Sequence, residues 1–304
     1  MNFDEFVWSD HPANPLIEPP FPDWIIADPT VMTPAESPDG RWHLFAHSIL
    51  RGIHHYTSSD GIRWQYLSKV CRGMRPFIFK HENKFYLFYE IFLHSLKSAV
   101  AVRQSSDFQK WSQQQIVLRP SLPWHGKIMR TCGNPCVVRR HGEFLLFYSA
   151  GSVILKDCLF TEPLHIGIAS SKHITGTYNP HPDPIISPDK NNPCRNLGAG
   201  AIKVIADEQH NILWGFNNGI YADAHRKSRS AILLLKSEDG LRWTQVHNEP
   251  IIKPTSGWKR ALVYALDIKL LNGEAYLYYN ARDGWLIGRE RIGLTIGNKR
   301  LNHR

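Results

Sequence analysis

The sequence predicts an all-β protein folded as a five-bladed β-propeller. Two phrases recur along its 304 residues at similar places in successive segments, and five aromatic runs each follow a short polar turn. Helix signals are almost absent, because no window of about twelve residues keeps a helical spacing of apolar side chains free of Gly or Pro. A pair of β-sandwiches is the alternative, but sandwiches do not require one phrase at one place in every unit, whereas radial repetition of four-stranded sheets does.

One phrase closes most of the units. TSSDGIRW, QSSDFQKW and KSEDGLRW end at Trp64, Trp111 and Trp243, and a degenerate copy, ASSKHITGTY, ends at Tyr178. The aligned serines are Ser58, Ser105, Ser170 and Ser237. We therefore expect the three Trp phrases to occupy equivalent places in three blades.

A second phrase, an apolar pair flanked by prolines, precedes four of the five units: NPLIEP (14–19), IVLRP (116–120), DPIISP (183–188) and EPIIKP (249–254). The aromatic runs are WHLFAH (42–47), FYLFYE (85–90), FLLFYS (144–149), ILWGFN (212–217) and AYLYYN (275–280). The turns before these runs are rich in Gly, Asn and Asp, which close β-hairpins. Each run is thus expected to be the second strand of a blade.

These repeats divide a single domain, residues 1–304, into blades at about 22–70, 71–115, 129–182, 196–248 and 260–297. The fifth unit has no closing Trp phrase. We expect its last strand to come from the N-terminal segment around 3–8, or its edge to be the C-terminal segment around 291–297.

The composition of the chain argues against several classes of protein. No apolar stretch approaches the ~18 residues of a membrane helix, so we expect a globular protein with no membrane partner. The N-terminus lacks the basic and then apolar order of a secretory signal, which predicts a cytoplasmic location. The net charge of +9 is scattered along the chain, unlike the clustered charge of a nucleic-acid binder. Five Cys without a CxxC pair indicate neither a disulfide framework nor a four-thiolate zinc site.

The starts of the innermost strands should converge on one rim of the channel. The candidate segments are WIIADPTV (24–31), GMRPFIF (73–79), TCGNPCVV (131–138), NLGAGAIKV (196–204) and LVYALDIKL (262–270). The ADP in the first segment, the repeated S-x-D-x-x-x-W phrases and the LFY-type second strands resemble the five-bladed glycosidase superfamily. That superfamily includes glycoside hydrolase family 43, the invertase-type enzymes and the mannoside phosphorylases.

The resemblance implies that Asp28 is the catalytic base or nucleophile. Two further carboxylates of the family 43 pattern do not carry over, because Phe77 and Gly133 stand at their positions. Glycoside hydrolysis needs a second carboxyl group across the scissile bond. We predict Glu90, at the end of FYLFYE, as that acid.

Other carboxyl groups compete with Glu90 for the acid role. Asp267 and Asp283 are rivals from the fifth blade. The long segment 151–167 carries Asp157 and Glu162, and long loops often border functional sites.

Polar residues end all five aromatic runs and predict a shared polar pocket: His47, Glu90, Ser149, Asn217 and Asn280. Guanidinium and amide groups give the directed hydrogen bonds that sugar hydroxyls or anions require, although a role between blades stays open for each. The predicted substrate-binding residues are His47, Arg75, Asn134, Asn218, Asp267, Arg282 and Asp283. We also expect Asp28, Arg75, Asn134 and Asp267 to meet at one end of the channel.

The sequence predicts no metal site and no cofactor. Its 16 His form no HExxH spacing, and no P-loop or strand-coupled GxGxxG is present. The resemblance leaves room for a single ion in the channel, as in some relatives. The leading function is a glycoside hydrolase acting on a terminal or short glycoside by carboxylate acid/base chemistry. The alternatives are a phosphorylase or transferase in which Arg75 and Arg282 hold phosphate, and a catalytically silent carbohydrate-binding propeller.

Overall fold

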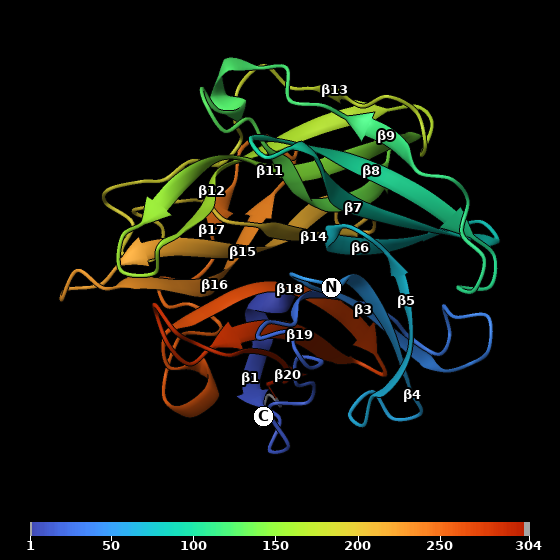
Figure 1. Cartoon of the computed structure of the whole chain (residues 1–304), viewed down its shortest axis with the longest axis horizontal. Coiled ribbons are helices and arrows are strands. Elements are labelled where there is room, and N and C mark those ends of the chain that lie inside the picture. The colour runs from blue at the N-terminus through green and yellow to red at the C-terminus, as the bar shows by residue number, and fades with distance from the viewer. Residues whose placement is uncertain (1, 301–304) are drawn as a thin grey trace.

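Five four-stranded antiparallel sheets surround a central channel in the computed structural model, which describes residues 2–300 (Figure 1). Blade 1 comprises β2 (Ala27–Met32), β3 (Trp42–Ser48), β4 (Gly52–Ser58) and β5 (Gln65–Cys71). Blade 2 comprises β6 (Met74–His81), β7 (Lys84–His94), β8 (Lys97–Ser105) and β9 (Gln115–Leu118). Blade 3 comprises β10 (Cys132–Arg140), β11 (Glu143–Leu155), β12 (Phe160–Ser171) and β13 (Asn179–Pro180).

Blade 4 comprises β14 (Ile202–Asp207), β15 (Ile212–Ala222), β16 (Ser228–Ser237) and β17 (Thr244–Gln245). Blade 5 comprises β18 (Leu262–Leu271), β19 (Glu274–Arg282), β20 (Glu290–Lys299) and the N-terminal strand β1 (Phe6–Asp10). Three short 3-10 helices are Phe3–Glu5, Pro123–His125 and Gly257–Lys259. The predicted all-β, five-bladed propeller is confirmed. Among residues 2–300, none of the helices has the length and apolarity to cross a bilayer.

The first strand of each blade lines the channel. These strands contact one another around the ring: β2 with β6 and β18, β10 with β6 and β14, and β14 with β18. Large apolar side chains fill the spaces between blades, with Tyr89, Tyr148, Phe88 and Phe147 fully buried. The starts of all five inner strands therefore lie at one end of the channel, as the repeats predict.

The Trp phrases occupy equivalent places between the third and fourth strands of blades 1, 2 and 4. In each, a serine hydroxyl accepts a backbone N–H three residues on, and an aspartate accepts backbone N–H groups of the turn. Each Trp then packs edge-on against a second-strand aromatic of the preceding blade: Trp64 on Tyr278, Trp111 on Phe45 and Trp243 on Phe147. In blade 3 the equivalent serine is Ser171, one residue beyond the predicted Ser170, because Ser171 pairs with Phe144 as Ser58 pairs with Trp42.

The N-terminal segment closes the ring. Strand β1 pairs antiparallel with β20, from Phe6 opposite Lys299 to Asp10 opposite Thr295, and Figure 1 shows this blue strand beside the red C-terminal strands. Just before β1, Phe3 is fully buried edge-on against Trp214 and Phe216 of blade 4. The first of the two predicted closures is thus confirmed.

Candidate active site

Equivalent bulges open the inner strands of blades 1 to 3. Pairing with the second strand skips from Ala27 to Thr30, from Met74 to Phe77 and from Gly133 to Cys136. At these bulges Asp28, Arg75 and Asn134, each followed by Pro, have φ of 51°, 53° and 47°. A left-handed φ is uncommon outside glycine, and such strain clusters at functional sites. The repeated Xaa-Pro step therefore turns one polar side chain per blade toward the channel mouth.

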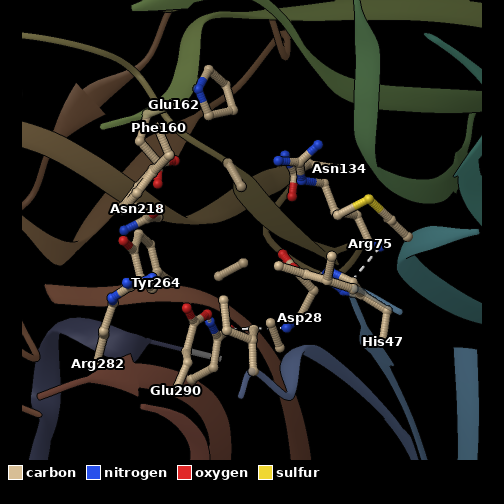
Figure 2. A pocket seen from close by; sticks show the side chains of 18 of the residues that line it. Asp28, His47, Arg75, Asn134, Phe160, Glu162, Asn218, Tyr264, Arg282 and Glu290 are labelled. Carbon is tan, nitrogen blue, oxygen red and sulfur yellow. Dashed lines mark hydrogen bonds and ion pairs between the residues drawn. The ribbon is translucent and has the colours of Figure 1, made fainter. Parts of the chain in front are cut away.

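A cavity of about 270 Å³ lies where these side chains meet (Figure 2). Six of the predicted catalytic and substrate-binding residues line it: Asp28, His47, Arg75, Asn134, Asn218 and Arg282. The cavity is smaller than the roughly 300–1,000 Å³ of drug-sized ligand pockets, which suits a single sugar unit. The predicted meeting of Asp28, Arg75 and Asn134 is confirmed, whereas their roles stay predictions.

The fourth expected partner, Asp267, is not in this cavity, so that prediction is wrong. Its Oδ2 accepts the Thr30 hydroxyl at 2.9 Å and the Val31 N–H at 2.7 Å, which ties β18 to β2. A fourth bulge, between Val263 and Leu266 of β18, directs Tyr264 and Ala265 into the cavity instead.

Asp283 also lies outside the cavity lining, contrary to expectation. It accepts the Arg289 N–H at 2.8 Å and an Arg291 Nη1 hydrogen at 2.9 Å. Its carboxyl group therefore holds the β19–β20 connection, residues 283–289, in shape.

Glu90 does not occupy the place of a proton donor to the main cavity. Its side chain is 1% exposed, and Oε2 accepts a hydrogen from Arg75 Nη1 at 2.6 Å. The carboxyl group also packs against the bare backbone of Gly133, where a Cβ would come within 1.9 Å of Oε2. The structure thus makes Glu90 the anchor of Arg75.

The polar ends of the second strands mostly join blades together. His47 Nδ1 accepts the Arg75 N–H, Ser149 donates to the Gly200 carbonyl, Asn218 donates to the Val263 carbonyl, and Asn280 accepts the Asp28 N–H. Three of these bonds reach from one blade to the inner strand of the next, and the bond of Ser149 reaches Gly200, two residues before the inner strand β14. This row is therefore a set of clasps between blades, of which His47, Asn218 and Asn280 also line the cavity.

Two further carboxyl groups face the cavity. Glu162 lies on β12, in the segment 151–167 that the sequence marked as bordering a site, and Glu290 is the first residue of β20. Figure 2 shows Glu162 and Asp28 facing the cavity from different sides. Glu290 was not predicted from the sequence, because Arg291 follows it and the pair has the appearance of a solvated start to the strand ERIGLTIG.

Burial has the largest effect on the pKa values of these carboxyl groups. It raises the pKa of Glu162 to about 7, against the attraction of Arg75, and Asp28 adds to the rise. Burial likewise raises the pKa of Glu290 to about 8, opposed by Arg282. The pKa of Asp28 is also raised by burial, while Arg75 and Lys203 favour its charged form.

Next to Asp28, the imidazole of His47 is neutral near pH 7, because burial lowers its pKa to about 3. Its Nδ1 lies 3.2 Å from Asp28 Oδ2. For Arg75, burial opposes the charge, but Glu90 and Asp28 hold the pKa of the guanidinium above its ordinary value. The cavity thus combines two permanent cations, Arg75 and Arg282, with carboxyl groups of unequal acidity.

A smaller cavity, of about 100 Å³, adjoins the main one between blades 2 and 3. The two share Arg75, Asn134 and Glu162 among their lining residues, while Phe92, Ser149 and Glu90 line the smaller cavity alone. Glu162 therefore lies at the junction of two adjacent spaces.

The Tyr264 hydroxyl is buried at the cavity wall, where its hydrogen favours the charged form of Glu162 and so opposes the rise in the pKa of that carboxyl group. Within residues 2–300, no group of three His, Cys, Asp or Glu is arranged to hold a metal ion.

No protein-family model matches this chain, and no curated protein does. Solved structures match along almost its whole length. An N-acetylgalactosamine deacetylase from F. plautii, in complex with blood group B trisaccharide, gives a TM-score of 0.72 at 13% identity, over 95% of each chain. The catalytic domain of the GH62 α-L-arabinofuranosidase from Coprinopsis cinerea gives 0.70 at 15% identity, over 97% of this chain and 98% of that one.

A third match comes from work on the GH130 family of mannoside phosphorylases, which contains glycoside hydrolases that target β-1,2 mannosidic linkages in Candida mannan. Its TM-score is 0.67 at 15% identity, over 95% of this chain and 93% of that one. At such identities the likeness shows the fold. The resemblance to the propeller glycosidases is thus confirmed as a shared architecture.

Proposed function

We propose that this protein is a glycoside hydrolase that removes a terminal sugar, with Glu162 as general acid and Asp28 as base or nucleophile. The observation that carries the proposal is the position of Glu162 at the junction of the two cavities, across the main cavity from Asp28. Several of the proteins that share the fold are glycosidases by name, which supports the same chemistry.

The geometry of the two cavities suits a different catalytic step for Glu162 and for Asp28. A sugar ring in the main cavity and its leaving group in the smaller one would place the glycosidic oxygen beside Glu162. With a pKa of about 7, Glu162 holds a proton near neutral pH and donates it to that oxygen as the C–O bond breaks. Asp28, as carboxylate, activates water or attacks the anomeric carbon.

The positive side chains favour a hydrolase over a phosphorylase. Arg75 Nη1 is bound to Glu90, and Arg282 donates from Nε to the Gly284 carbonyl and from Nη2 to the Leu286 carbonyl. Arg282, with both Nε and Nη2 engaged, is poorly placed to bind a free phosphate, and the charge of Arg75 is already paired with Glu90. Hydrolysis of a glycoside without added phosphate is the expected activity.

The test is a panel of aryl and unactivated glycosides, with and without phosphate, turned over by the wild type, Asp28→Asn, Glu162→Gln and Glu90→Gln. Asp28→Asn should abolish turnover of all substrates. Glu162→Gln should cost about 10²- to 10⁴-fold on unactivated glycosides and much less on aryl glycosides whose leaving groups need little protonation. It should also remove a decline of kcat/KM above about pH 7, where the wild-type acid loses its proton.

The variant Glu90→Gln distinguishes the role of Glu90 from that of Glu162. Because Glu90 anchors Arg75, its loss should slow both substrate classes alike. Equal losses for Glu162→Gln on both classes would remove Glu162 as the acid. Turnover that depends on phosphate would replace the hydrolase with a phosphorylase, and binding of sugar without turnover would leave a carbohydrate-binding propeller.

A further inference from the structure

The exposed apolar side chains gather on one face of the propeller. In each blade, the connection between the second and third strands and the connection to the next blade lie at the channel end that holds the cavity. We call this end the pocket face. Of the fifteen exposed large hydrophobic side chains in residues 2–300, eleven lie in or beside these connections, three lie on outermost strands, and one, Leu241, is in a connection of the opposite face.

Several of these side chains are at the tips of separate connections, next to basic residues. Examples are Ile49-Leu50-Arg51, Lys127-Ile128, Ile154-Leu155-Lys156 and Leu286-Ile287-Gly288-Arg289. The tip residues Leu50, Ile128 and Ile287 are 70%, 79% and 80% exposed. Single exposed hydrophobic residues are ordinary, but repetition on connections around one cavity mouth marks an interaction surface.

The balance of basic and acidic residues also differs between the pocket face and the opposite face. The connections of the pocket face hold fourteen Arg and Lys against eight Asp and Glu, whereas those of the opposite face hold five against eight. The scattered charge of the sequence is therefore sorted by the fold into a basic pocket face and an acidic opposite face. A surface that binds the pocket face must be negatively charged and must accept apolar tips.

We propose that the pocket face docks on an anionic lipid bilayer, with the apolar tips inserted at the level of the headgroups and the basic residues among the lipid phosphates. Separate protruding tips suit a fluid bilayer, which needs no matching shape, whereas a protein partner needs a complementary surface. Basic residues near an anionic leaflet and apolar groups below it act together in such binding. The docked face also carries the cavity mouth, but vesicle binding is measured without turnover, so its outcome does not depend on the proposed hydrolase activity.

The expectation of no membrane partner rested on the absence of an apolar stretch long enough to span a bilayer. A peripheral surface leaves no such stretch, because its residues come from connections far apart in the sequence, such as 49–51 and 286–289. The fold alone brings them together at the channel mouth.

The test is co-sedimentation of the full chain with vesicles of phosphatidylglycerol and phosphatidylcholine, compared with phosphatidylcholine alone. The wild type should bind the mixed vesicles only, and less tightly as salt is raised. Ile128→Ser with Ile154→Ser and Ile287→Ser should weaken binding more than about tenfold, and Lys127→Gln with Lys156→Gln should weaken it about tenfold or more.

Matched controls lie on the opposite face, where Leu241→Ser and the pair Lys110→Gln with Lys172→Gln should bind as the wild type does. Thermal unfolding checks that every variant is folded. The proposal is overturned if the wild type ignores the mixed vesicles or if the opposite-face variants lose as much binding as the pocket-face ones. A dimer that the triple serine variant abolishes, with no vesicle binding, would instead make this face a contact between two copies of the chain.

Discussion

Three carboxyl groups near one channel mouth differ in their surroundings. Glu90 is bound to an arginine and Glu162 faces the space between two cavities. Glu290 accepts a hydrogen from Asn280, which in turn accepts the Asp28 N–H. Burial has the largest effect on the pKa values of Glu162 and Glu290, while the different neighbours give each of the three groups a different role.

Glu290 gives the stability of the protein a pH dependence. Its folded-state pKa of about 8 lies above the ordinary 4.5, so its contribution is fully present below about pH 4.5 and is lost as the pH rises through about 8. Between roughly pH 5 and pH 9, the wild type should lose about 1 kcal/mol or more of unfolding free energy beyond what Glu290→Gln loses. Urea unfolding at the two pH values measures the difference.

Glu82→Gln serves as the control, because that side chain is 83% exposed and the change in net charge is the same. If Glu82→Gln flattens the pH dependence as much as Glu290→Gln does, burial of Glu290 is not its cause.

The inner-strand bulges are the elements that build the site, and the one in blade 3 needs a glycine. A Cβ at Gly133 would meet Glu90 Oε2 at 1.9 Å, and Glu90 cannot retreat without leaving Arg75. Gly133→Ala should therefore destabilise the protein by about 1–3 kcal/mol.

A double-mutant cycle tests this contact. Glu90→Ala removes the obstructing carboxyl group, so the double variant should be more stable than the sum of the two single losses by about 1 kcal/mol. Additive losses, measured by urea unfolding, would show that Gly133 is constrained by something other than Glu90.

The Trp phrases were sufficient to predict the blades because each phrase makes its own turn. The serine and aspartate bond within the phrase, and the Trp packs on a residue type that every second strand supplies. The polar ends of the second strands were harder to interpret. A residue such as Ser149 follows the pattern of a pocket residue, but it bonds to Gly200 of another blade, a contact that only the assembled ring creates.

The sequence also allowed only some of the carboxyl groups of the site to be predicted. Asp28 could be found because the ADP at the start of the first inner strand resembles that of the propeller glycosidases. Glu162 lies on a hairpin that is extended in blade 3, and Asp267 turns away because β18 has its bulge three residues earlier. An argument from repeats predicts the features that all blades share. Glu162 and Asp267 are at places where one blade differs from the others, so the repeats could not predict their positions.

At the scale of the whole molecule, the ring depends on a junction between its two ends. Phe3, fully buried against Trp214 and Phe216, fastens the N-terminal segment to blade 4. Phe3→Ala should cost about 3–5 kcal/mol of unfolding free energy, because it leaves a cavity among aromatic rings. Val7→Ala, on the half-exposed face of β1, should change stability by no more than about 0.5 kcal/mol.

Urea unfolding of the two variants measures the comparison. A small loss for Phe3→Ala, similar to that of Val7→Ala, would mean that β1 adds little to ring closure and that blades 1 to 5 are held by their lateral contacts alone.

Because β1 closes the ring, the order in which the strands are translated determines when the ring can close. Among the strands of the ring, Phe6–Asp10 is translated before all others, whereas its partner Glu290–Lys299 is translated after all others. At roughly 5–20 residues per second, the nascent chain waits on the order of 15 s to a minute with that strand unpaired. A ribosome that stalls before codon 290 releases a chain with two open sheet edges, which is a substrate for chaperones and proteases. The ring therefore cannot close until the chain has been translated through its last strand, Glu290–Lys299.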